Sequence, residues 1–208
     1  MLVIACGAIA KEIVSLKKLN HWDQLELICL PAIWHNFPER IPGAVEEKIQ
    51  RAQAENKKVF VAFADCGTGG RLDRVLAKYQ VERLPGAHCY AFFTGCEAFE
   101  QLHEEELGTM YLTDFLVRNF DYFIIKGLGI DRHPELQGMY FAHYKRLVYL
   151  AQFEDPALLE QAKAAAKRLD LEFHYRFTGM GELGSSLDKQ AHHFLPNTHN
   201  NHQAQRSI

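Results

Sequence analysis

Three of the five cysteines stand where an apolar run ends or a turn begins: Cys6, Cys66 and Cys89. Zinc and other soft metals prefer thiolate and imidazole ligands, arranged as a tetrahedron. The three cysteines therefore predict a metal site, most simply a zinc site, with His35 or His88 as the fourth ligand or as a proton carrier. The other two cysteines fall within expected regular structure, and we expect both in the core: Cys29 and Cys96.

The same side chains allow a second chemistry. A thiol becomes a nucleophile when a neighbouring imidazole or a helix N-terminus favours the thiolate. Cys66 or Cys89 could be such a thiol, activated by His35 or His88. In either chemistry the expected catalytic residues are His35, Asp65 and His88.

A glycine-rich turn follows the apolar run Val59–Ala64. Glycines let backbone approach a ligand closely, and the N–H groups at the start of a helix attract anions. The expected cofactor-binding residues are Gly67, Thr68, Gly69 and Gly70, while Asp65 either orients the ligand or caps the next helix. The turn lacks the lysine of a P-loop and the spacing of a dinucleotide fingerprint. It therefore leaves open a binding module for a phosphate-bearing cofactor or another small molecule, in which the cysteines belong to the core.

Strands and helices alternate along the chain. Helical spacing is expected over residues 9–19, 43–55, 71–78 and 156–169, and strands over 2–6, 25–30, 59–64, 146–151 and 171–177. This alternation predicts an α/β, Rossmann-like layered fold with a mostly parallel sheet and helices on both faces. Because parallel strands end at one edge of a sheet, we expect five strand-end features to converge there: Cys6, His35, Cys66, Cys89 and Thr178.

We expect a single α/β domain over residues 1–187. The aromatic segment 108–145 is predicted to be an α-helical insertion or lid, and the polar residues 188–208 to be a disordered tail. An aromatic helical segment of this kind is compatible with a homodimer.

The composition bounds the protein class. The chain has 208 residues, 48% of them hydrophobic, and a formal net charge of −3. This balance is that of a globular protein and gives no support to a nucleic-acid partner. No apolar run has the length of a membrane span, and the first residues resemble no signal peptide. We therefore expect a cytoplasmic protein without membrane contact, whose odd number of cysteines are thiols or ligands rather than disulfides.

Several separated motifs together resemble one bacterial and archaeal family, which is known only as a domain of unknown function. The motifs are Cys6-Gly7-Ala8, His35-Asn36 with Ile41-Pro42 and Glu46, Asp65 to Gly70 with Leu72-Asp73, Pro85 to Tyr90, and Phe177-Thr178-Gly179. The resemblance extends from about Met1 to Leu187.

Genes of that family often lie beside corrinoid-dependent methyltransferases of the trimethylamine or betaine type and their reductive activators. The resemblance thus implies a role in one-carbon or methylamine metabolism, with a small-molecule substrate and a corrinoid protein or methyltransferase as partner. Together with the cysteines, this resemblance leads to our main hypothesis, a metal-binding protein that acts in methyl-group transfer. If the protein is an enzyme, we expect a metal-dependent methyltransferase or a related one-carbon enzyme. An accessory or chaperone protein that docks a methyltransferase through residues 108–145 is a further hypothesis.

Overall fold

A computed structural model describes residues 1–194. The first half of the chain contains the following elements: β1 (Leu2–Cys6), η1 (Gly7–Ile9), α1 (Ala10–Leu19), β2 (Glu26–Leu30), η2 (Ala32–Asn36), η3 (Pro38–Arg40), α2 (Ile41–Ala54), β3 (Val59–Ala62), α3 (Arg71–Tyr79), β4 (Glu82–Arg83), α4 (Cys89–Thr94) and α5 (Cys96–Glu105). The second half contains β5 (Thr109–Thr113), α6 (Asp114–Arg118), the π-helix η4 (Asp121–Lys126), α7 (Leu136–Phe141), β6 (Arg146–Ala151), α8 (Pro156–Leu169), β7 (Glu172–Phe177) and α9 (Gly181–Phe194).

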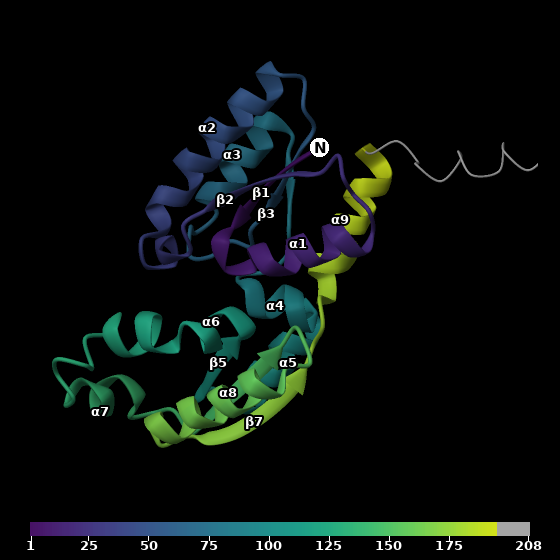
Figure 1. The fold of residues 1–208 in the computed structure, drawn as a ribbon. Coiled ribbons are helices and arrows are strands. Elements are labelled where there is room, and N and C mark those ends of the chain that lie inside the picture. Colours follow the sequence, from purple (N-terminus) through teal and green to yellow (C-terminus); the bar gives the residue numbers. More distant parts are fainter. Residues whose placement is uncertain (195–208) are drawn as a thin grey trace, which may run out of the picture.

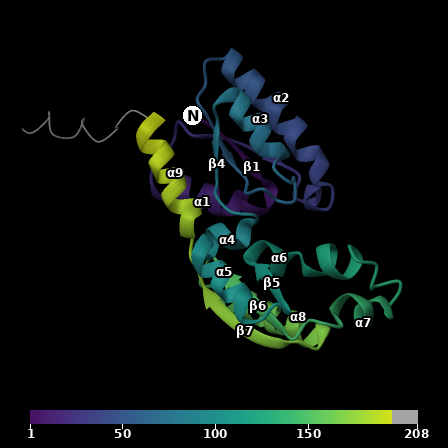
Figure 2. The ribbon, with the colours of Figure 1, turned by 180° about the vertical axis from the view of Figure 1, so that it is seen from behind.

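The strands form two parallel sheets. The first has the order β2-β1-β3-β4, and the second has the order β5-β6-β7. Every residue of β1 and β3 is buried, as expected for central strands covered on both faces. In Figures 1 and 2, α2 and α3 run side by side along one face of the first sheet, and α1 and α9 lie on its other side.

The α/β layering with parallel strands is confirmed, but segment 108–145 differs from its prediction. Its first residues form β5, an edge strand of the second sheet, and only the remainder is helical. The cause is that all five residues of β5, Thr109–Thr113, are buried, with Tyr111 facing Phe99. The aromatic content that suggested a helical lid is therefore partly strand core.

The predicted start of the disordered tail, residue 188, is also wrong. α9 continues to Phe194 because Leu187 and Ala191, one turn apart, are both buried against the protein. Residues 188–194 are therefore helical, and residues 195–208 lie outside the described part of the chain. Among residues 1–194 no helix is long and apolar enough to span a membrane.

A close backbone approach joins the two sheets where the chain returns from β7 to α9. Gly181 has φ +47°, and a Cβ built on it would lie 2.2 Å from the Phe93 carbonyl oxygen of α4. Gly181→Ala should therefore destabilise the fold by about 2–4 kcal/mol, through overpacking and backbone strain. Gly43 in α2 has nothing within 4 Å of its Cβ position, so Gly43→Ala should be neutral or stabilising by up to about 1 kcal/mol. Urea unfolding of both variants tests this, and equal effects would contradict it.

Candidate functional site

The first sheet changes direction between β1 and β3. The chain moves from β1 to β2 on one side and then returns to place β3 on the other side of β1. Ligands of open α/β sheets bind outside the carboxyl ends of the strands at such a switch point. The switch point here is formed by Cys6, the last residue of β1, and by the segment that follows β3.

Cys6 is buried at the turn from β1 into η1. Its Sγ accepts a hydrogen bond from the backbone N–H of Ala8, at 3.4 Å. The thiol thus caps the first helical turn, and it lies directly beyond the end of the sheet.

Cys66 and Cys89 are held together by backbone pairing after β3. The N–H of Asp65 donates to the Gly86 carbonyl at 3.1 Å, and the N–H of Cys66 donates to the Ala87 carbonyl at 2.8 Å. Cys66 has φ +49°, a left-handed conformation that costs a non-glycine residue about 1–2 kcal/mol. This pairing overcomes the strain and brings the Pro85–Gly86 turn, and with it Cys89, to the end of β3.

His35 approaches the same place from η2, the short helix that follows β2. Its Nδ1 lies 3.0 Å from the Ala32 carbonyl oxygen and 3.7 Å from the Cys6 Sγ. A carbonyl oxygen can only accept, so Nδ1 carries the hydrogen, and Nε2 keeps the lone pair that a metal needs. Imidazole ligands of metals are commonly oriented by such a bond from the other ring nitrogen.

These four side chains line one small cavity: Cys6, His35, Cys66 and Cys89. The rest of the wall is apolar, formed by Ala8, Ile9, Ala62, Phe63, Ala64 and Phe92. The volume is about 10 Å³, which is the room needed by one water molecule or one ion. His35 is exposed, whereas Cys6 and Cys66 are buried, so the imidazole lies at the solvent side of the cavity.

The residues match the family model described as Protein of unknown function (DUF1638) over positions 29–187. The chain belongs to this family. The matched span includes His35, Cys66 and Cys89, and Cys6 lies upstream of it. No curated protein and no solved structure matches the chain. Family membership therefore agrees with the resemblance seen in the motifs, and the chemistry has to be argued from the site.

Burial keeps the thiols of this cysteine cavity neutral when no metal is bound. Burial raises the pKa of Cys6 to about 12 and that of Cys66 to about 11. Burial likewise raises the pKa of Cys89, and the neighbouring Cys66 and Cys6 raise it further. Protonated thiols are poor nucleophiles, and the hydrogen on Nδ1 of His35 leaves that nitrogen unable to accept a proton from Cys6. The arrangement thus weighs against thiol catalysis in the metal-free protein.

The donor set fits zinc in kind and number, but its donor atoms are not placed as a metal site. Within residues 1–194, no group of three or more His, Cys, Asp or Glu side chains has its donor atoms placed to hold a metal ion. Metal binding would require the sulfur atoms to come closer together and the thiols to lose their protons. The site is therefore described as a set of candidate ligands around one cavity.

The amide groups of the glycine-rich turn donate hydrogen bonds to a carboxylate of the same turn, that of Asp65. Asp65 Oδ1 accepts hydrogen bonds from the Thr68 hydroxyl at 2.7 Å and from the Gly70 N–H at 2.9 Å, and Oδ2 accepts one from the Gly69 N–H at 3.0 Å. The amides expected to cradle a phosphate thus already have an anion. Thr68 is buried, and Gly67 lies against Pro38. Asp65 thus closes the turn that precedes α3 and does not cap the helix itself, whose N-cap is Gly70 without a side-chain bond. The bonds within the turn weigh against a phosphate site at Gly67–Gly70.

These bonds also set the titration of Asp65. Burial alone would raise its pKa, but the bonds from Gly70, Thr68 and Gly69 outweigh burial and hold the pKa below its usual value. A carboxylate with a lowered folded-state pKa stabilises the fold above its unfolded pKa of about 3.9, and this contribution is lost as the pH falls through the folded value.

Asp65→Asn should therefore destabilise the fold by about 1–2 kcal/mol at neutral pH, because the amide loses one of the two acceptor oxygens. The gap between wild type and variant should shrink as the pH falls below about 4. Urea unfolding across this range measures both, and a gap that does not depend on pH would contradict the assignment.

His88 does not line the cavity, although it precedes Cys89. It is the N-cap of α4, and its ring packs against Tyr90 and Phe99 at centroid distances of 5.1 and 4.9 Å. Burial lowers the pKa of His88, and its Nδ1 is buried with no hydrogen-bond partner among residues 1–194. The structure therefore brings His35, and not His88, to the three cysteines.

The remaining strand-end and cysteine predictions need correction. Thr178 follows β7 of the second sheet and bonds with Gln152 and Ala151, so it does not join the cysteines. Cys29 is exposed on β2, because this edge strand leaves most of its side chains uncovered. Cys96 is half-buried, with its Sγ 3.4 Å from Oε2 of Glu182.

The sequence analysis missed a buried polar network at the carboxyl ends of the second sheet. Asp114 is fully buried and accepts hydrogen bonds from the Tyr149 hydroxyl at 2.7 Å and the Gln152 N–H at 3.0 Å. Arg118 donates to its other oxygen at 3.2 Å. No sequence pattern indicates this network, because Tyr149 and Gln152 lie 35 and 38 positions from Asp114.

Proposed function

We propose that this protein binds one soft divalent metal ion, zinc foremost, in the cavity between β1 and β3. The observation that carries the proposal is that three thiols and an imidazole from four separate segments line one ion-sized cavity. Zinc takes such ligands in tetrahedral sites. The site also lies where sheets of this connectivity bind their ligands.

Metal binding would reverse the effect of burial on the cysteines. A coordinated thiol is deprotonated outright, since the charge of the ion replaces the missing solvent. Ligation by Cys6, Cys66 and Cys89 leaves one position of a tetrahedron for the Nε2 of His35. Because His35 is exposed, it is the ligand that a substrate could displace, after which its imidazole is free to carry a proton.

We further propose that the metal site serves methyl-group or one-carbon metabolism in the cytoplasm. Thiolate-bound zinc lowers the pKa of a bound thiol or water and so supplies a nucleophile at neutral pH. The cavity has room for a single ion only, so a small-molecule substrate would bind outside it, on the His35 side. The corrinoid proteins implied by the motif resemblance are the proposed partners in methyl transfer.

A second candidate function, docking of a methyltransferase, is favoured by exposed side chains in the segment 108–145. Met139 is 74% exposed, Tyr140 47% and Tyr144 40%. These residues belong to α7 and the segment directly after it, and exposed apolar patches are typical of protein contact sites. Met139→Glu should then abolish co-elution with a corrinoid methyltransferase and leave the metal content unchanged. Co-elution that survives Met139→Glu would remove this candidate.

The test of metal binding is elemental analysis of the full-length, tag-free protein purified with reductant and without chelator. We expect about one equivalent of zinc per chain, in line with the strong binding of structural thiolate sites. Protein that contains no metal, and takes up none on addition of zinc, would overturn the proposal.

A further inference from the structure

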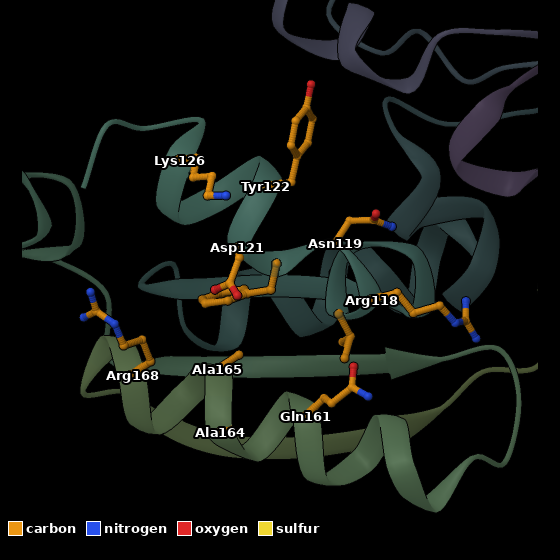
Figure 3. A pocket seen from close by; sticks show the side chains of 11 residues that line it. Arg118, Asn119, Asp121, Tyr122, Lys126, Gln161, Ala164, Ala165 and Arg168 are labelled. Atoms are coloured by element: carbon orange, nitrogen blue, oxygen red, sulfur yellow. The ribbon is translucent and has the colours of Figure 1, made fainter. Parts of the chain in front are cut away.

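A second cavity lies between α6–η4 and α8, on the unit built around the second sheet (Figure 3). Its volume is about 580 Å³, within the range of roughly 300–1,000 Å³ found for small-molecule sites. It shares no lining residue with the cysteine cavity. It is therefore a separate site, and no step of the proposed metal chemistry uses it.

Three of its lining residues are cationic: Arg118, Lys126 and Arg168. Arg118 is already paired with the buried Asp114. Arg168 donates through Nη1 to Oε1 of Gln137 at 2.6 Å, a bond that orients its guanidinium. Arg168 and Lys126 form no ion pair with a carboxylate of residues 1–194. Two cationic side chains thus line the cavity without an ion-pair partner among the described residues, although the Asp121 carboxylate lines the same cavity.

The π-helix explains how Lys126 reaches this cavity. A π-helix closes its hydrogen bonds over five residues instead of four, and such segments occur frequently at functional sites. In η4 this winding leaves Lys126 closer to the face of Asp121 than α-helical winding would, and both line the cavity. In an α-helix, with 3.6 residues per turn, Lys126 would be rotated by roughly 140° from Asp121.

The opposite wall leaves room for a ligand. Ala164 and Ala165 of α8 face η4 with methyl groups only, and Gln161 and Arg168 stand on either side of them (Figure 3). Asp121 extends from η4 toward this wall. The cavity therefore offers the cationic side chains of Lys126 and Arg168, the carboxylate of Asp121 and an amide from Gln161.

We propose that this cavity binds a small metabolite with an anionic head group, a phosphate or a carboxylate. Lys126 and Arg168 bind the head group, since a guanidinium matches either group with two parallel hydrogen bonds. Asp121 accepts a hydrogen bond from a hydroxyl or amine elsewhere on the ligand. Gln137 is a positioning residue, because it acts through the guanidinium of Arg168.

The experiment is a titration of ¹⁵N-labelled full-length protein with inorganic phosphate and, separately, with acetate, followed by backbone amide shifts. We expect saturable shifts confined to residues 117–126 and 161–168 with at least one of the two anions. Arg168→Gln and Lys126→Gln should each weaken the binding at least roughly tenfold. Lys163→Gln, the same change on an α8 residue that pairs with Glu160 outside the cavity, should not weaken it.

Absence of saturable shifts with both anions would overturn the proposal. It would equally be overturned if Lys163→Gln weakened the binding as much as Arg168→Gln, because the anion would then respond only to overall charge. Circular dichroism confirms that the variants are folded. Repeating the titration with a chelator present separates this site from the metal site, since the shifts should be unchanged.

Discussion

Cys66→Ser is expected to release the bound zinc at a chelator concentration that leaves the wild-type protein fully loaded. The serine removes one of the three proposed thiolate ligands that line the cavity. Loss of an outer-shell partner already costs about 10–100-fold in metal affinity, so loss of a ligand should cost more. Competition with a chromophoric chelator measures the change.

Cys29→Ser is the matched control for this prediction. Cys29 is exposed on β2 and does not line the cavity, so its replacement should leave zinc affinity within error of the wild type. Cys6→Ser and Cys89→Ser should behave like Cys66→Ser. If all four variants bind zinc equally well, the metal is held elsewhere and the proposed site is wrong.

Asp114→Ala should be the most destabilising single change in the second half of the chain, by about 3–5 kcal/mol. Removing one partner of a buried charged network leaves the other groups without their bonds. Here the Tyr149 hydroxyl, the Gln152 N–H and the Arg118 guanidinium would all lose an acceptor. Burial raises the pKa of Tyr149, and its bond to Asp114 raises it further, so this hydroxyl remains a donor across the working pH range.

Urea unfolding tests the Asp114 prediction. Asp23→Ala, in the exposed turn before β2, is the control and should change stability by less than about 0.5 kcal/mol. A loss below about 1 kcal/mol for Asp114→Ala would show that the network is not a stabilising unit.

The convergence of the three cysteines could be predicted because it depends on a general property of parallel sheets. Strand ends at the same edge meet when their strands are neighbours, and β1 lies directly beside β3. Cys89 joined them through the turn at Gly86, which the Pro-Gly signal marked correctly. The metal itself remains a prediction.

The choice between His35 and His88 could not be made from the sequence, because it depends on where α4 begins. Cys89 is the first helical residue, so His88 and Cys89 leave the backbone in different directions. One side chain enters the cavity and the other enters the aromatic cluster with Phe99. Adjacency in sequence was therefore a poor guide to adjacency at the site.

The division of the strands into two sheets, the strand β5 and the cavity between η4 and α8 were not predicted, for related reasons. β5 is short and aromatic, and its burial depends on β6, which follows more than thirty residues later. The π-helix has no sequence signature separate from that of an α-helix, so the presence of Lys126 and Asp121 in one cavity is visible only in three dimensions. The glycine-rich turn was predicted correctly as a turn. Its amide groups, however, bind the carboxylate of Asp65, which belongs to the same motif, and not a ligand.

The central claim is that three cysteines and His35 surround one metal ion, and X-ray absorption at the zinc edge tests it most directly. On the full-length, zinc-loaded protein we expect a shell of three sulfur atoms at about 2.3 Å and one nitrogen at about 2.0–2.1 Å. A shell of nitrogen and oxygen alone, such as the histidines between His192 and His202 could supply, would contradict it.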